Sequence, residues 1–299
     1  MEYNKPPKTF KEQVELLTSR GLIIKNEERA ESILREINYY RLRSYTIPFE
    51  ITPHKFIEGT QIEDIYSLCE FDRRLRKIIF NAIEFIEISL RSVIAYNWSH
   101  KYGPFGHEKN QNFKEKFNWK EWIVKVHKQA EDKEESEIFI THFKKTYEEY
   151  PSLPIWVMVE TISMTLLSQF YSGMLKEDQI SISKEYAIHS EVFRRWLHNF
   201  TYIRNICAHH SCLWNRNLSV KLVIPKDIRW NRLNGSKLGS VIVALNKVLG
   251  SKIFRKDIKI LWQKDIETLI DNHPEVPDFW NKIGLSENWK ESLLWKEEN

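Results

Sequence analysis

One amphipathic segment, from about Ile62 to His100, limits the folds that this chain can adopt. Its apolar residues recur at helical spacing and form a single stripe, made of Ile79, Ala82, Ile83, Ile86, Leu90 and Val93. Charged residues occupy the opposite arc, at Glu84, Glu87 and Arg91. The pattern predicts one long helix that ends at Gly103 and Pro104.

The rest of the composition also favours helices. The chain of 299 residues contains only 9 Gly and 10 Pro, too few for an all-β protein rich in turns. We therefore expect an all-α fold with a central helical core and helical additions at both ends. The expected division is an N-terminal helical segment at 1–58, the core at 59–216 and a mostly helical C-terminal extension at 217–299.

Local signals place several other elements. Thr9 is a suitable N-cap for the first helix, and Gly21 is a suitable stop. The apolar segment 155–175 is expected to form one buried helix, and the segment 190–208 is expected to form the next. Short strands are expected around 218–224.

Charge and cysteine content restrict the environment. The formal net charge of +4 is compatible with an anionic partner but does not identify one. The three cysteines cannot all pair, which favours a reducing compartment over a disulfide framework. The polar N-terminus does not resemble a signal peptide, and the chain lacks the run of about 18 apolar residues that spans a membrane. We expect a cytoplasmic protein without a membrane partner.

The most informative string is Arg204-Asn205-Ile206-Cys207-Ala208-His209-His210. On a helical wheel Arg204 falls about 40° from Phe200, inside the apolar stripe of its helix. A guanidinium there must be paired, stand at the mouth of a pocket or face another subunit, because burying it alone is costly. Asn205 and His209 are four residues apart and share a face, so Asn205 is a candidate to orient His209.

These groups suit metal-independent RNA cleavage. A histidine titrates near neutral pH and can move protons when the RNA 2′-OH attacks the adjacent phosphate. An arginine keeps its charge and can stabilise the extra negative charge on phosphorus. The competing interpretation is an ordinary helix end, where two histidines complement the helix dipole.

The motif and its surroundings resemble a known family. RNICAHH followed by LWNR resembles the R-x4-6-H motif of HEPN ribonucleases, as found in the bacterial Abi family of abortive phage-infection proteins. Two N-terminal strings, KTFKEQVELLTSRGLII and INYYRLRSYTIPF, are similar to that family's N-terminal signature. FDRRLRKIIFNAIEFIEISLRSVIAY is similar to its first core helix and LPIWVMVETISMTLLSQFYSGM to its third. The resemblance covers about Lys5 to Arg216.

The resemblance implies a HEPN-type four-helix bundle core and an endoribonuclease that acts as a toxin in phage defence. It implies that Arg204 and His209 are catalytic, with Asn205 beside them. It further implies a homodimer in which two motif helices form one composite site, and some members are paired with a small non-coding RNA. The expected partner is an RNA substrate, and no cofactor is expected.

Three assignments remain open. His210 also satisfies the motif spacing and competes with His209 for the catalytic role. Glu87 and Arg91 are either a surface ion pair or supporting residues that line the pocket and steady Arg204. The basic run is either a solvated face or a set of RNA phosphate contacts, at Arg73, Arg74, Arg76 and Lys77.

Two other functional classes compete with the ribonuclease. A non-catalytic RNA-binding module of the same fold would bind RNA without cutting it. A protein scaffold would use the motif as a dimer contact. A zinc site made from Cys207, His209, His210 and Cys212 is not expected, because their spacing matches no usual ligand pairs.

Overall fold

The computed structural model describes residues 6–133, 137–147 and 152–296. Within this part of the chain the regular structure is almost entirely helical, which confirms the all-α prediction. The helices are α1 Phe10–Ser19, α2 Glu27–Glu36, α3 Tyr39–Thr46, α4 Ile62–Tyr102, α5 Trp119–Asp132, α6 Ile138–Thr146, α7 Ile155–Thr161, α8 Met164–Gly173, α9 Lys176–Glu185, α10 Ser190–Ala208, α11 Leu238–Leu249, α12 Lys256–Asp271, α13 Phe279–Ile283 and α14 Leu293–Lys296. Two short antiparallel strands, β1 Glu50–Thr52 and β2 Lys55–Phe56, were not expected.

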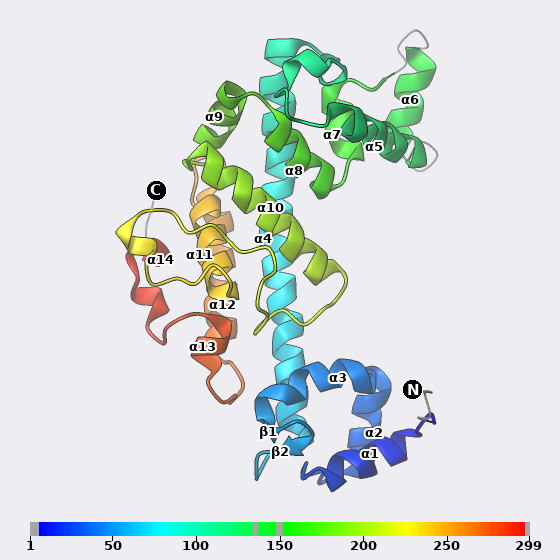
Figure 1. Cartoon of the computed structure of the whole chain (residues 1–299), viewed down its shortest axis with the longest axis vertical. Helices are drawn as coiled ribbons and strands as arrows, with labels where there is room; N and C mark the ends of the chain where they lie inside the picture. Colours follow the sequence, from blue (N-terminus) through cyan, green and yellow to red (C-terminus); the bar gives the residue numbers. More distant parts are fainter. Residues whose placement is uncertain (1–5, 134–136, 148–151, 297–299) are drawn as a thin grey trace.

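The long helix α4 forms the axis of the molecule (Figure 1). The predicted apolar stripe is buried, and α4 packs against α3, α7, α9, α10, α11 and α12. Gly103 ends the helix in the left-handed region, with φ of 77°. A glycine is suited to this position because it has no Cβ to clash there.

The N-terminal helices lie at one end of α4 (Figure 1). Thr9 caps α1 with a reciprocal capping box to Glu12, and Gly21 turns the chain at φ of 91°. Both signals were predicted from the sequence. Helix α3 then packs on α4 and brings its side chains towards the end of α10.

The apolar segment 155–175 does not form the single helix that was expected. It divides into α7 and α8 at Ile162, whose backbone is extended with ψ of 149°. Ser163 starts the second helix by accepting a hydrogen bond from the Leu166 amide at 3.5 Å. Both α7 and α8 are buried, so the sequence is apolar on either side of the break. The hydrophobic pattern of the sequence therefore gives no sign of it.

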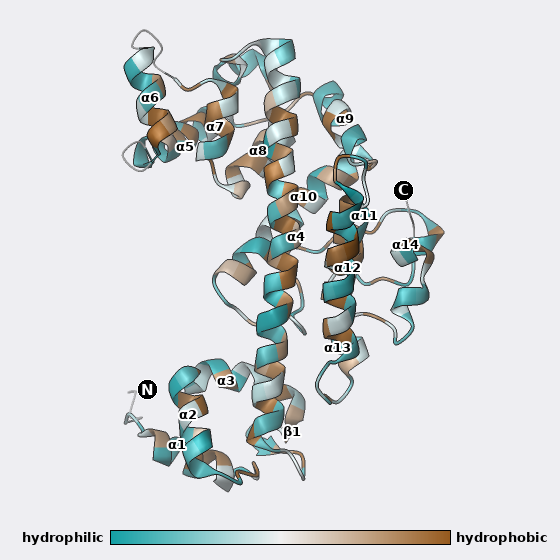
Figure 2. Ribbon diagram, turned by 180° about the vertical axis from the view of Figure 1, so that it is seen from behind, coloured by the Kyte–Doolittle hydropathy of each residue, from teal (hydrophilic) through white to brown (hydrophobic). Residues whose placement is uncertain are grey.

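The C-terminal extension packs directly on α4. Every residue of α11 except Lys247 is buried, and α11 contacts α4, α12 and α14. Trp262 of α12 donates to the Ile78 carbonyl of α4 at 3.0 Å. Hydrophilic and hydrophobic residues follow one another along α12 (Figure 2). One continuous hydrophobic core joins the three expected regions, so the boundaries near 58 and 216 stay predictions.

The strands expected at 218–224 are absent from the described residues of that segment. Leu218 and Leu222 donate backbone hydrogen bonds to Ser236 and Gly235, at 2.9 and 2.8 Å, without forming a regular ladder. Side chains of α10 occupy other carbonyls of this segment, which prevents a second strand from pairing there. The segment therefore runs along α10 as irregular chain.

Candidate functional site

Helix α10 ends at the motif in a Schellman arrangement. The His210 amide donates to the Cys207 carbonyl and the Ser211 amide to the Ile206 carbonyl, both at 3.0 Å. The His209 amide still donates to the Asn205 carbonyl at 3.0 Å. His209 is therefore the C-cap residue, whose amide makes the last helical hydrogen bond of α10.

His210 has left the helix. Its φ of 56° lies in the left-handed region, which glycine usually occupies at this position of the motif. Its carbonyl accepts a hydrogen bond from Arg41 of α3. His210 therefore has no position on the helical wheel of α10, and its side chain is exposed.

His209 is also exposed, whereas Asn205 is half-buried. Among the described residues, the Asn205 side chain makes no hydrogen bond to His209, although the two share a face of α10. The expected orienting contact is thus not formed within one chain.

Arg204 lies where the sequence placed it, among apolar residues that face α4. Its guanidinium carbon lies 5.6 Å from the centre of the Phe80 ring. Its Nε atom is buried and has no hydrogen-bond partner. In the part of the chain that the structure describes, no carboxylate pairs with Arg204.

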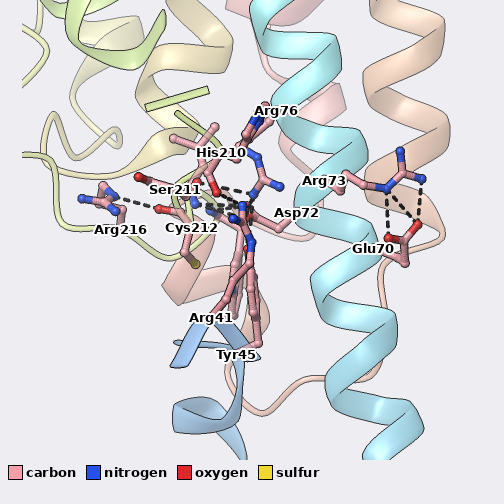
Figure 3. A network of polar contacts seen from close by, with 12 residues as sticks. Arg41, Tyr45, Glu70, Asp72, Arg73, Arg76, His210, Ser211, Cys212 and Arg216 are labelled. Carbon is pink, nitrogen blue, oxygen red and sulfur yellow. Dashed lines mark hydrogen bonds and ion pairs between the residues drawn. The ribbon is translucent and has the colours of Figure 1, made fainter. Parts of the chain in front are cut away.

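A buried acidic residue, Asp72, holds the loop that follows the motif (Figure 3). It accepts hydrogen bonds from the Tyr45 hydroxyl at 2.8 Å and from Arg76. It also accepts from the amides of Leu213 and Trp214, at 3.1 and 2.8 Å. Burial raises the pKa of the Asp72 carboxyl, and these four donors oppose that shift. The network thereby joins α3, α4 and the loop after α10.

The basic run of α4 divides between two roles. Arg76 is buried, pairs with Asp72 and donates to the Ser211 carbonyl at 3.4 Å, so its side chain is committed to the loop. Arg73, Arg74 and Lys77 are exposed. Arg73 pairs with Glu70 away from the network (Figure 3). Arg76 is therefore not available as the phosphate contact that the run predicted.

Glu87 and Arg91 form an ion pair, but not beside Arg204. Their side chains are only 15% and 10% exposed, and Arg91 also donates to the Val159 carbonyl of α7. Arg91 lies 11 positions beyond Phe80 on α4, which corresponds to about 16 Å along the helix. The pair is neither a solvated surface contact nor a support for Arg204 within one chain.

The two cysteines near the motif are structural. Burial raises the pKa of the Cys207 and Cys212 thiols to about 12. Cys212 donates a weak hydrogen bond to the Asn215 side chain at 3.7 Å. Both groups therefore remain protonated thiols at neutral pH.

Sequence reasoning missed three residues that shape the site: Arg41, Tyr45 and Asp72. A signal existed for Asp72, since it stands four residues before Arg76 and thus shares its helix face. No such signal existed for Arg41 and Tyr45, because their role depends on how α3 packs against the end of α10.

The fold and the site define an all-α protein with an unpaired arginine and two exposed histidines at the end of a central helix. The family model of the Abi-like proteins matches residues 32–215, which is more than half of the chain. The chain therefore belongs to the Abi-like family, which indicates a role in abortive infection, a form of phage defence. None of the curated proteins and none of the solved structures matches it.

One further property bears on the cellular setting. Among the described helices, none is both long enough and apolar enough to cross a lipid bilayer.

Proposed function

We propose that the protein is a metal-independent HEPN endoribonuclease that acts as a toxin in abortive infection. Arg204 and His209 are its catalytic residues. The family assignment supports the defence role, and the arginine-histidine spacing supports the nuclease.

The observation that carries the proposal is the environment of Arg204. Among the described residues, this guanidinium has a buried, unpartnered Nε and no ion pair with a carboxylate, so it contributes little to folding. Such a cation is suited to an anion that arrives from outside the chain. It stands five residues, about 1.4 helical turns, before His209, whose exposed side chain can move protons.

The reaction requires only groups of the RNA and the protein. His209 takes the proton of the 2′-OH while the oxygen forms a bond to the adjacent phosphorus. The bond from phosphorus to the 5′-oxygen breaks, and that oxygen takes up a proton from a second imidazole. Arg204 stabilises the extra negative charge on the phosphoryl oxygens. The products are a 2′,3′-cyclic phosphate and a 5′-hydroxyl.

The second imidazole is the reason to propose a homodimer. His210 has its backbone bound in the turn after α10, so a partner subunit's His209 is the better donor. Two motif helices that meet would also bring a second Arg204 to the phosphate. A small non-coding RNA is a further candidate partner, which would restrain or direct the toxin.

The test is cleavage of RNA by the purified protein in the presence of EDTA. We expect 2′,3′-cyclic phosphate and 5′-hydroxyl ends, and no cleavage of 2′-O-methyl RNA. Arg204→Ala and His209→Ala should each reduce the rate by about 10² to 10³.

Two matched controls accompany these variants. Arg29 lies 5.0 Å from the Tyr66 ring, so Arg29→Ala removes a similar cation–π contact far from the motif. His142→Ala removes another exposed histidine. Both should cut RNA like the parent. Binding of RNA without cleavage by the parent would favour a non-catalytic module, and an altered oligomeric state in Arg204→Ala without loss of cleavage would favour a scaffold.

A further inference from the structure

A polar groove lies beside α10, away from the motif itself. Helix α10 forms its floor, and α8 and the segment 219–223 form its walls. The groove encloses about 520 Å³. Its wall is fixed to the floor, since Trp196 donates to the Val223 carbonyl at 2.8 Å and Asn199 to the Val220 carbonyl at 2.6 Å.

The side chains that line the groove suit an anion. Three are permanent cations, Arg194, Arg195 and Lys221, and His198 lies among them. The α8 wall presents hydroxyl and amide groups, at Thr165, Ser168, Gln169 and Ser172. Among the described residues, no aspartate or glutamate lines the cavity. Hydroxyls and amides can bind phosphate oxygens as readily as the cations can.

Among the described residues, Glu191 is the carboxylate that pairs with cations of this lining. It accepts hydrogen bonds from Arg194 at 2.6 Å and from Arg195 at 3.4 Å. The three cations and this one carboxylate leave a net charge of +2. In the described chain, neither Lys221 nor His198 has a polar partner.

One more cation, Lys114, lies beside the same groove. Lys114 donates to the Ser172 carbonyl on the α8 wall at 3.3 Å. Burial and the nearby charges of Arg194 and Lys176 lower the pKa of Lys114, while Glu191 raises it. The region is thus positive enough for its cations to oppose each other's charge, which an anionic ligand would relieve.

The floor of the groove continues to the motif. On α10, Arg194, His198, Asn205 and His209 fall within about 60° of one another. His209 belongs to this face because its amide still makes the helical hydrogen bond. The distance along the helix from His198 to His209 is about 16 Å. One polar face therefore links the basic groove to the proposed catalytic histidine.

We propose that this groove binds the phosphodiester backbone of the RNA strand that is cut at the motif, with Arg194, Arg195 and Lys221 as phosphate contacts. The inference rests on the proposed nuclease function for the identity of the strand. A groove of cations and hydroxyls without exposed aromatic rings would bind RNA largely without regard to sequence.

The test measures binding apart from cleavage. Fluorescence anisotropy would follow 2′-O-methyl oligonucleotides from dinucleotide to dodecanucleotide, which lack the attacking hydroxyl, over a range of salt concentrations. The test variant is Arg195→Gln with Lys221→Gln, both exposed side chains. The matched control is Lys120→Gln with Lys128→Gln on α5, which removes the same charge from another exposed surface.

We expect the test variant to bind the longer oligonucleotides several-fold more weakly than the control. The slope of log affinity against log salt should fall by about 1 to 2, because about 0.7 counterions per phosphate contact are released from a single strand. Equal affinity and slope in the two variants would overturn the proposal. Adenosine monophosphate that binds the groove as tightly as the dodecanucleotide would also overturn it, in favour of a free nucleotide ligand.

Failure of the nuclease proposal gives a different result. If the parent binds the oligonucleotides through the groove but leaves unmodified RNA intact, the groove is an RNA-binding site and the catalytic assignment is wrong. If the parent cuts RNA and the test variant binds and cuts like the control, the nuclease proposal is supported and the proposal that the groove binds RNA is wrong. The Arg204→Ala variant should fail to cut unmodified RNA and should still bind the oligonucleotides through the groove.

Discussion

Two buried arginines of α4, Arg76 and Arg91, differ from Arg204 of α10 in the partners that the fold gives them. On α4, Arg76 and Arg91 are buried, and each pairs with a carboxylate four residues earlier on the same helix. On α10, Arg204 is half-buried, but Phe200 stands four residues earlier and Ala208 four residues later, so neither position offers a carboxylate. Arg76 and Arg91 also bind backbone carbonyls of other segments, whereas the Nε atom of Arg204 has no partner.

This difference distinguishes cations that hold the structure from one that does not. A buried ion pair is costly to break because the remaining charge has no partner. Arg204 leaves no such charge behind when it is removed. Its position on an apolar stripe is therefore better explained by an external anion or a second subunit than by stability.

The strongest test of the comparison is Asp72→Ala. The substitution leaves Arg76, the Tyr45 hydroxyl and two backbone amides without their acceptor. We expect the free energy of unfolding to fall by about 3–5 kcal/mol, measured by chemical denaturation. Glu70→Ala is the control, because its partner Arg73 is exposed, and it should cost less than about 1 kcal/mol. Similar losses in both variants would mean that the buried network stabilises the fold no more than an exposed ion pair does.

The same comparison can be made between single arginines. Arg91→Met leaves Glu87 buried without its cation and should lower the free energy of unfolding by about 2–3 kcal/mol. Arg204→Met replaces the arginine with an apolar side chain of similar length, and it should change the free energy of unfolding by less than about 0.5 kcal/mol. A comparable loss in Arg204→Met would show that the arginine has a structural partner, in which case its assignment as a free cation is wrong.

Much of the fold could be predicted because its signals are local. The capping box at Thr9 and the glycine after α4 each require only neighbouring residues. The break at Ile162 could not be predicted, because an apolar run looks the same whether it forms one helix or two. The segment 218–224 was also misjudged, since its carbonyls bind side chains of α10 that lie more than twenty positions earlier.

The candidate site was predicted less completely. Periodicity correctly placed Arg204 on the apolar stripe of α10. The roles of Arg41 and Tyr45 depend on the packing of α3 against the motif loop, which no local pattern encodes. The end of α10 at Ala208 was predicted, but the left-handed turn at His210 was not, because a histidine occupies a position where glycine would have been the signal.

The two histidines at this turn can be separated by His210→Gly. A left-handed backbone strains a residue with a Cβ, so the substitution should raise the free energy of unfolding by about 1 kcal/mol. Cleavage of RNA should persist, because Arg41 binds only the backbone carbonyl. His209→Gly, at a negative φ of −89°, should instead destabilise the protein and abolish cleavage. Loss of cleavage in His210→Gly alone would exchange the roles of the two histidines.

The smallest effect is expected at the beginning of α10, where Glu191 is shared by Arg194 and Arg195. Hydrogen bonds from Arg194 lower the pKa of Glu191 from its ordinary value of 4.5 to about 2. A lowered folded-state pKa contributes stability that is present above pH 4.5 and is lost as the pH falls towards 2. Because Glu191 is 46% exposed, solvent screening keeps this contribution small.

Glu191→Gln should therefore weaken the dependence of stability on pH between 4.5 and 2, measured by thermal unfolding at a series of pH values. The same variant removes the carboxylate that pairs with Arg194 and Arg195 and so frees two arginines of the groove. We expect it to bind 2′-O-methyl RNA more tightly at low salt, with a steeper salt dependence than the parent. Weaker binding would mean that Glu191 is needed to hold Arg194 in place. The paired arginines at the beginning of α10 would then resemble those of α4, and only Arg204 would act as a cation without a structural role.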